Sequence, residues 1–278
     1  MTTELPTIAI TGATGFVGGE VARHLSASGV DTRLLVRGTP PDIDRTVPFT
    51  VDYADAAAAQ AALTGVHTLF MVSGRESEGR VDDHKTFIDA AAEAGVSHIV
   101  YTSFFGAAPD AVFTLGRDHY ATERHIEKSG MGFTFLRDNL YADFLPMMAG
   151  EDGVIRGPAG DGRVAAVARE DVARVAYAVL RQPAEHRDVA YLLTGPEALT
   201  LAEVAEVVTA AGTPTRFEHE TLDEAYASRA VYGAPDWQVE AWVSTYTAIA
   251  AGELALVTDD VERVTGRRAV SLADILAS

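Results

Sequence analysis

The sequence predicts an α/β fold with a doubly wound parallel sheet and a smaller, mainly helical C-terminal lobe. Short apolar runs alternate with helical patterns over most of the first 196 residues, and a glycine-rich turn follows the first of these runs. The runs are apolar throughout, without alternating polar residues. Strands of this kind are typical of a parallel sheet that helices cover on both faces.

The expected elements can be placed along the chain. Strands are expected at 7–11, 32–36, 47–51, 68–72, 98–102, 133–136 and 189–193, and helices between Phe16 and Gly29 and at 52–63, 81–94, 118–128 and 169–181. The region 150–162 is predicted to be a loop, and the chain from Thr200 onward to be mainly helical. Thr200 with Glu203, and Thr221 with Glu224, have capping-box spacing.

Composition limits the possible partners and compartments. The chain carries 40 acidic and 22 basic residues, a formal charge of −18. This balance disfavours nucleic acid and anionic lipid, because both are bound by Lys and Arg. The absence of cysteine removes disulfides and thiolate sites. With no leader pattern and no apolar run of roughly 18 residues, we expect a cytoplasmic protein without a membrane or nucleic-acid partner.

Gly12, Gly15 and Gly18 in TGATGFVG lie directly between an expected strand and an expected helix. In the first strand–helix unit of a Rossmann-type sheet, such glycines permit a tight turn, close approach of a pyrophosphate and close helix packing. The helix N-terminus then offers amide groups to the phosphates. This context predicts a dinucleotide site. The alternative is a glycine-rich turn in a fold that has lost its cofactor.

Arg37 follows the second expected strand, where NAD-preferring sites place an acid for the adenosine 2′-hydroxyl. A guanidinium at this place suits a 2′-phosphate, so NADP(H) is favoured over NAD(H). A solvated surface arginine is the alternative. We expect residues 1–196 to form the nucleotide-binding core, with 138–165 contributing to a substrate cleft. Residues 197–278 are expected to form a helical lobe on the substrate side, packed as part of one domain.

The chain resembles a known family almost from end to end. The segments that carry the resemblance are TGATGFVG, VDYAD, VSHIVYTSFFGA, HYATERHIEKSG, FTFLRDNLYADF and GDGRVAAVAREDVA. They are similar to those of the NmrA-like atypical short-chain dehydrogenase/reductases, in particular the branch of type 2 NAD(P)H:quinone oxidoreductases and triphenylmethane reductases. The family also contains proteins that bind NADP(H) as sensors.

The resemblance implies roles for particular residues. It places one group around the cofactor: Gly12, Ala13, Thr14, Gly15, Phe16 and Val17 at the pyrophosphate, Arg37 at the 2′-phosphate, Asp52 and Tyr53 beside the adenine, and Val72, Ser73 and Asp138 toward the nicotinamide. A second group would border the substrate: Phe104, Phe105, Asn139 and Tyr141. Asp138 replaces the asparagine expected in the family's L-R-N segment, so substrate inferences from this segment are weakened.

His119 is the candidate catalytic residue. Alignment with the family places it where other short-chain dehydrogenases have the lysine of Tyr-xxx-Lys, and places Leu115 at the tyrosine position. Histidine as a residue type titrates near neutral pH and can donate a proton or hold the ribose. We expect His119 in the first turn of its helix, and a polar residue of no catalytic role is the alternative.

The sequence therefore predicts an NADP(H)-dependent oxidoreductase that transfers hydride to a quinone-like or conjugated small-molecule acceptor. The alternative is a redox sensor that binds NADP(H) without turnover and acts through a protein partner. The histidines lack the spacing of a metal site, so no metal is expected. The sequence leaves the oligomeric state open.

Overall fold

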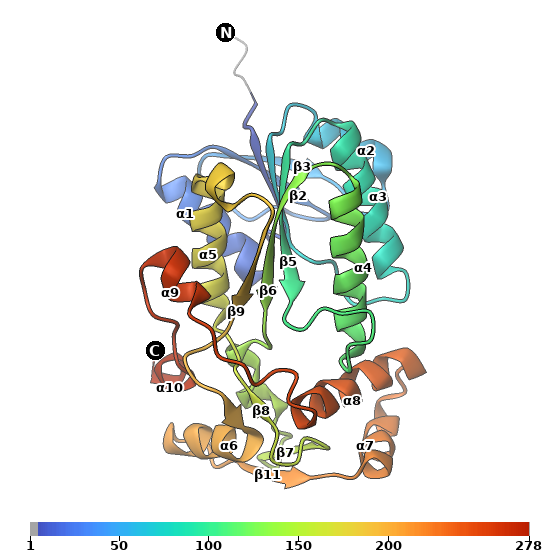
Figure 1. The fold of residues 1–278 in the computed structure, drawn as a ribbon, viewed down its shortest axis with the longest axis vertical. Helices are drawn as coiled ribbons and strands as arrows, with labels where there is room; N and C mark the ends of the chain where they lie inside the picture. The colour runs from blue at the N-terminus through green and yellow to red at the C-terminus, as the bar shows by residue number, and fades with distance from the viewer. Residues whose placement is uncertain (1–4, 278) are drawn as a thin grey trace. The chain divides into compact units, whose positions relative to one another are not determined.

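The computed structural model describes residues 5–277, and its main sheet has seven strands in the order β3-β2-β1-β4-β5-β6-β9 (Figure 1). The strands are β1 Ile8–Thr11, β2 Thr32–Val36, β3 Thr46–Thr50, β4 Thr68–Met71, β5 His98–Phe104, β6 Gly132–Asp138 and β9 Val189–Leu193. β1 pairs in parallel with both β2 and β4, and β2–β3 and β4–β5 are also parallel. The predicted doubly wound parallel sheet is confirmed.

The order of the strands reverses between β1 and β4. β1 leads outward to β2 and β3 on one side, and β4 continues to β5 on the other. In sheets of this kind ligands bind beyond the carboxyl ends of the strands at this reversal, where the crossover connections diverge. The topology therefore marks the ends of β1, β2 and β4 as the place for a ligand.

Helices cover both faces of this sheet. They are α1 Phe16–Ala27, α2 Ala56–Leu63, α3 Arg80–Glu93, α4 Thr114–Lys128 and α5 Arg169–Arg181. In Figure 1, α1 and α5 lie on one face, and α2, α3 and α4 on the other. Leu69, Phe87 and Ile99 are fully buried in the core between the sheet and the α2–α3 layer, as the continuously apolar strands predict.

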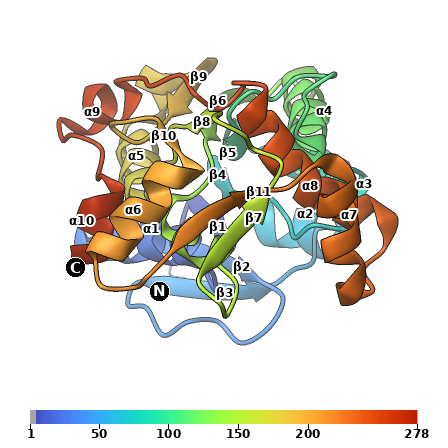
Figure 2. The same ribbon diagram turned by 90° about the horizontal axis from the view of Figure 1, so that it is seen from below.

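The chain forms two compact units that interleave in sequence. The first comprises residues 1–103, 120–136 and 172–191, and the second comprises 104–119, 137–171 and 192–278. The second unit adds two small sheets, β7 Val154–Gly157 with β11 Arg216–His219 and β8 Arg163–Val164 with β10 Leu199–Thr200. Figure 2 shows β7 and β11 side by side.

The second unit is otherwise mainly helical. Its helices are α6 Leu201–Ala210, α7 Leu222–Arg229, α8 Asp236–Ala250, α9 Asp260–Thr265 and α10 Leu272–Ala277, with short 3₁₀ turns at Ala142–Phe144, Pro146–Met148 and Ala230–Tyr232. A further 3₁₀ turn, Pro183–His186, belongs to the first unit. Both predicted capping boxes are present: Thr200 with Glu203 begins α6, and Thr221 with Glu224 begins α7. Each box satisfies two amides that the helix leaves unpaired.

Three local predictions are wrong. The helix expected at 52–63 begins only at Ala56, because Asp55 is its N-cap and accepts from the Ala58 amide through its side chain. Tertiary contacts explain the other two. The helix expected at 118–128 begins four residues earlier at Thr114, although Gly116 disfavours helix. Leu115 is buried and the Thr114 amide donates to Ser244 Oγ (3.1 Å), which stabilises this additional turn. The expected loop at 150–162 contains β7, because β11, which follows it by some 60 residues, supplies the hydrogen-bonding partner.

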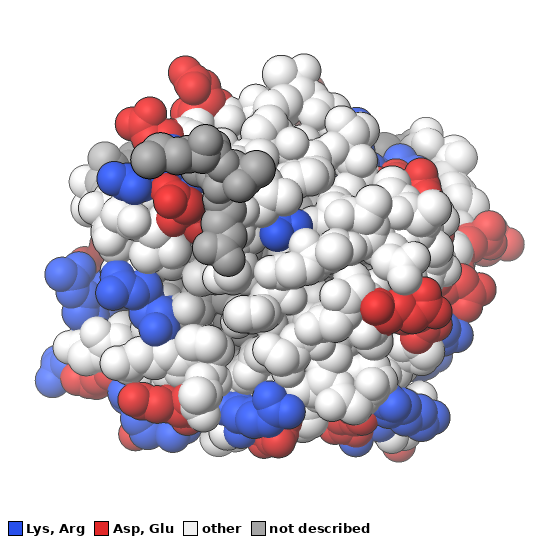
Figure 3. All heavy atoms as spheres, turned by 90° about the horizontal axis from the view of Figure 1, so that it is seen from above, with Lys and Arg blue, Asp and Glu red and all other residues white. Residues whose placement is uncertain are grey.

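Charged side chains of both signs share the surface. On the face shown in Figure 3, they lie mostly around the rim, with blue and red groups next to one another. Surface ion pairs of this mixed kind contribute little to stability individually. None of the helices within residues 5–277 is long and apolar enough to cross a membrane.

Candidate cofactor and substrate sites

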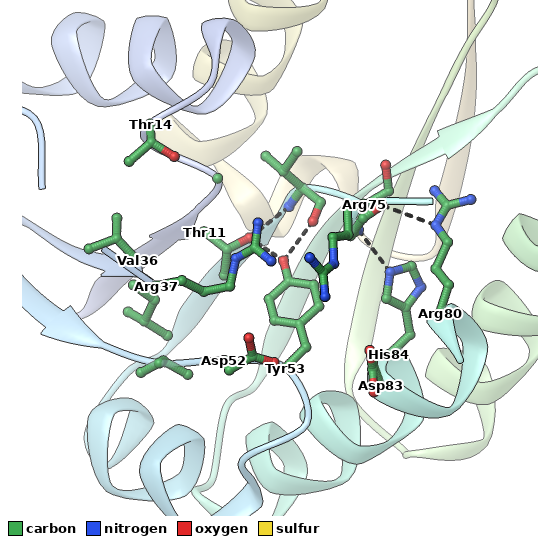
Figure 4. Close-up of a pocket in the computed structure, with 16 residues that line it drawn as sticks. Thr11, Thr14, Val36, Arg37, Asp52, Tyr53, Arg75, Arg80, Asp83 and His84 are labelled. Carbon is green, nitrogen blue, oxygen red and sulfur yellow. Dashed lines mark hydrogen bonds between the residues drawn. The ribbon is translucent and has the colours of Figure 1, made fainter. Parts of the chain in front are cut away.

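A pocket lies in the first unit at the carboxyl ends of β1, β2 and β4 (Figure 4). This is the point where the strand order reverses. The pocket is lined by Thr11, Gly12, Thr14, Leu35, Val36, Arg37, Val51, Asp52, Tyr53, Val72, Ser73, Gly74, Arg75, Arg80, Asp83 and His84. Its walls combine apolar strand ends with three arginines and two carboxylates.

The three glycines of the motif, Gly12, Gly15 and Gly18, differ in how strictly the structure requires glycine at each position. Gly12 has φ +66°, and a Cβ there would lie 2.8 Å from the Val72 Cβ. A Cβ on Gly18 would lie 2.5 Å from the Gly12 carbonyl oxygen, so α1 packs against the turn only without a side chain. A Cβ on Gly15 would meet only this same oxygen, at an ordinary 3.4 Å. The protein's own packing therefore requires Gly12 and Gly18, but leaves space at Gly15.

This open position suits a phosphate group. Gly15 is the N-cap of α1 and has no side chain to cap the helix, and the first turn of α1 has no acidic residue. A helix N-terminus of this kind attracts an anion, because its amides and its dipole carry partial positive charge. The residues present thus fit a dinucleotide pyrophosphate.

Tyr53 closes the floor of the pocket through a ring of hydrogen bonds. Its hydroxyl donates to the Val72 carbonyl (2.6 Å) and lies 2.5 Å from Thr11 Oγ1, which accepts from the Val72 amide (2.9 Å). Its ring stacks on Phe87, with the ring centroids 4.3 Å apart. Burial raises the pKa of Tyr53 well above its usual value, so the phenol stays neutral. Tyr53 therefore joins the ends of β1 and β4.

The chain that follows β4 is held by two side chains from α3. The Gly74 amide donates to His84 Nε2 (2.8 Å), and Arg80 Nε donates to the Gly74 carbonyl (3.1 Å). His84 Nδ1 lies 2.9 Å from Thr122 Oγ1. Because Nε2 accepts, the neutral ring carries its proton on Nδ1 and donates it to Thr122. Burial, and then the charge of Arg80, lower the pKa of His84 to about 3.

Many of the residues expected around a cofactor line this pocket. Those that do are Gly12, Thr14, Arg37, Asp52, Tyr53, Val72 and Ser73. Ala13 and Val17 are buried beneath the turn, and Phe16 begins α1 with 40% of its surface exposed. Asp138 belongs to the second unit.

The sequence patterns did not single out Arg75, Arg80 or His84. The available signal was position: Arg75 comes four residues after β4, on the edge of the sheet where ligands bind. Arg80 and His84 lie one helical turn apart in α3. Their shared target, the Gly74 backbone, becomes visible only in three dimensions.

The other expected site residues lie in the second unit. Tyr141 donates to Asp138 Oδ2 (2.5 Å). Burial, and then the neighbouring Asp138 carboxyl, raise the pKa of Tyr141 well above its usual value. Asn139 is 1% exposed, and its side chain donates to the Leu254 carbonyl (3.0 Å) and accepts from the Leu140 amide (2.8 Å). Asn139 therefore fixes the chain just after β6 against the backbone at Leu254.

Phe104, Phe105 and His119 are all buried. The ring of Phe104 lies 6.0 Å from that of His119 and 4.7 Å from that of Phe113, between centroids. His119 is the sixth residue of α4, so the expectation that it lies in the first turn is wrong: the packing of Leu115 extends the helix upstream.

A cavity of about 740 Å³ opens in the second unit. Most of its walls are aromatic and apolar: Leu140, Tyr141, Phe144, Leu145, Met147, Met148, Tyr232, Trp242 and Tyr246. Its polar end contains an ion pair between Arg229 and Glu220 (2.9 Å), and Arg229 also lies over the Tyr246 ring at 5.0 Å. This size and lining are typical of small-molecule sites.

Residues 4–228 match the model of the NmrA-like family. The chain belongs to the NmrA-like family. The resemblance seen in the sequence is thereby confirmed. Within residues 5–277, this NmrA-like protein has no cluster of three His, Cys, Asp or Glu side chains placed to hold a metal ion.

Three relatives match nearly the full length of this NmrA-like protein. It is 34% identical over 275 residues to an NAD(P)H azoreductase of Xenophilus azovorans, which covers 96% of each chain. The NADPH-dependent quinone oxidoreductase QOR2 of Escherichia coli, solved with NADPH, is 29% identical with a TM-score of 0.87, covering 97% of this chain and 98% of that one. The Citrobacter sp. triphenylmethane reductase, solved with NADP(H), is 28% identical with a TM-score of 0.83, covering 98% and 99%.

We predict that His84 makes the stability of the protein depend on pH. The unfolded chain protonates His84 near pH 6.5, whereas the folded chain keeps it neutral down to about pH 3. The unfolded state therefore binds more protons, and stability falls as the pH drops below about 6.5. Between pH 7 and pH 5 the wild type should lose about 2 kcal/mol more than His84→Gln, measured by urea unfolding.

The matched control is His67→Gln, which changes an exposed histidine. The free energy of unfolding of His67→Gln should change between pH 7 and pH 5 by the same amount as that of the wild type. A stability difference between wild type and His84→Gln that does not change with pH would show that His84 is not held neutral.

Proposed function

We propose that this protein is an NADPH-dependent reductase that transfers hydride to a quinone-like or conjugated small-molecule acceptor. An NAD(P)H azoreductase and an NADPH-dependent quinone oxidoreductase match this chain almost from end to end, which supports a reductase function. The protein is an NAD(P)H-dependent oxidoreductase of the NmrA-like family. The observation that favours NADPH as the cofactor is Arg37, which lines the pocket that also contains the glycine turn.

The residues of the pocket supply binding and orientation. The turn around Gly15 and the start of α1 would hold the pyrophosphate, and Arg37 would hold the 2′-phosphate through charge-assisted hydrogen bonds. Val72 and Ser73, at the end of β4, would guide the nicotinamide end of the cofactor. The bound cofactor supplies the hydride, so the protein needs to provide position and a site that excludes water.

The cavity of the second unit is our candidate for the acceptor site. Flat aromatic or conjugated molecules fit its walls of Phe144, Met148 and Trp242, since such walls bury apolar surface and stack on rings. Tyr141 lines this cavity, and its hydroxyl is held by Asp138. Phe104 and Phe105 are core residues and would act by shaping the unit.

His119 remains our candidate for the proton. Its ring packs against Phe104 near the start of α4. A quinone that accepts hydride also needs one proton, which a histidine or solvent can supply. We therefore assign His119 a supporting role in turnover and none in cofactor affinity.

The function is tested by adding acceptors to the protein with NADPH and following the absorbance of the reduced cofactor. The panel contains menadione, an azo dye, a triphenylmethane dye and a simple enone. We expect NADPH oxidation with at least the quinone. Binding of NADPH without oxidation by any acceptor would contradict the proposal and favour the redox-sensor alternative.

Arg37→Glu should weaken NADPH binding far more than NADH binding. The 2′-phosphate loses a cation and meets a carboxylate, at a cost of about 1.5–3 kcal/mol, whereas NADH has a hydroxyl there. Calorimetry with both cofactors measures this difference. Arg23→Glu, which alters an exposed arginine of α1 outside the pocket, is the control. Equal losses for both cofactors in Arg37→Glu would remove the argument for NADPH.

His119→Ala should lower kcat about tenfold and leave the Kd for NADPH within a few-fold. A full general acid contributes roughly 10²–10⁴ in rate, but solvent replaces part of this for a quinone. His125→Ala, on the same helix with its ring paired to Asp89, is the control and should not change kcat. A kcat equal to that of the wild type in His119→Ala would show that His119 does not contribute to turnover.

A further inference from the structure

Arg75 is an exposed guanidinium in the cofactor pocket, and it reaches the pocket from a different segment than Arg37. Arg37 directly follows β2, whereas Arg75 lies between β4 and α3. In Figure 4 both side chains extend toward the ring of Tyr53. The pocket therefore has cations on two of its walls.

Neither of these arginines has a carboxylate partner. Within residues 5–277, Arg37 and Arg75 form no ion pair and no side-chain hydrogen bond, although Asp52 and Asp83 line the same pocket. Several exposed arginines elsewhere pair with acids, as in Arg23–Glu20, Arg45–Asp31, Arg163–Glu203 and Arg216–Glu218, whereas Arg117, Arg181 and Arg267 are exposed singly, outside the pocket. In a chain with a charge of −18, two unpaired arginines in one pocket indicate an anionic ligand.

The backbone next to Arg75 is fixed. Gly74, its neighbour, is held at its amide by His84 and at its carbonyl by Arg80. A side chain that starts from a fixed backbone loses less freedom on binding, so its contact contributes more to affinity. With Arg75 the charged side chains of the pocket carry one net positive charge, and without it none.

We propose that Arg75 is a second cationic contact for the 2′-phosphate of NADPH, facing Arg37, and that it contributes to selection of NADPH over NADH. The assignment rests on the proposed function. A phosphate monoester has enough oxygens to accept from two guanidiniums at once. Without Arg75, Arg37 and Arg80 would only balance the two carboxylates, and the 2′-phosphate would meet a pocket with no net positive charge.

The experiment is calorimetric titration of the purified protein with 2′,5′-ADP, 5′-AMP, NADPH and NADH. In Arg75→Ala we expect the Kd for 2′,5′-ADP and NADPH to rise about tenfold, with 5′-AMP and NADH unchanged within twofold. Arg75→Lys should recover part of the loss, because a point charge still attracts phosphate. Arg23→Ala removes the same charge outside the pocket and should leave every Kd unchanged.

The outcomes separate this assignment from the function itself. Equal losses for all four ligands in Arg75→Ala would show that Arg75 contacts a part that all four share, the adenosine or its 5′-phosphate, and would overturn the assignment. No loss at all would also overturn it. Either result, with Arg37→Glu still selectively impaired, leaves NADPH as the cofactor. A wild-type protein that binds NADPH no better than NADH overturns both proposals.

Discussion

The hydrogen-bond ring of Thr11, Tyr53 and Val72 is the constraint on which the candidate cofactor pocket depends. It ties the carboxyl end of β1 to that of β4 at the reversal of the strand order. The chain leaves β1 and β4 toward opposite sides of the sheet at this point. Without the ring, the two strands would be joined only by their backbone pairing at residues 8–10 and 68–70. Since these hydrogen bonds occupy the hydroxyl of Tyr53, this residue braces the floor of the pocket. The glycine turn continues from the end of β1 and the segment 72–75 from the end of β4, so both start from strand ends that this ring holds together.

Local charge, and not net charge, decides what this pocket can bind. An excess of 18 negative charges would repel an anionic cofactor at long range, but at physiological salt such fields are screened within about 8 Å. Side chains in direct contact therefore dominate. Arg37 and Arg75 line one pocket and have no acidic partners among residues 5–277, whereas several other exposed arginines, such as Arg23 and Arg163, are paired with a glutamate. The acidic surface and the cationic pocket are thus compatible in one molecule.

The cavity of the second unit is mainly apolar, in contrast to the charged pocket of the first unit. Its cavity is formed by large apolar and aromatic side chains around one ion pair, Arg229–Glu220. A buried ion pair contributes little net stability but becomes costly when one partner is lost, which fixes the polar end of the cavity. If this cavity is the acceptor site that we propose, it would select by shape and stacking more than by specific hydrogen bonds.

The sequence by itself determined the parallel sheet, the glycine turn before α1, the arginine after β2 and both capping boxes. These depend on neighbours close in the chain: apolar runs, backbone freedom at Gly12, and side chains three residues apart such as Thr200 and Glu203. The tertiary structure decided the start of α4, the pairing of β7, the support of Gly74 by His84, and the presence of Arg75 in the same pocket as Arg37. Each of these joins segments far apart in sequence, and local propensity contains no information about such contacts.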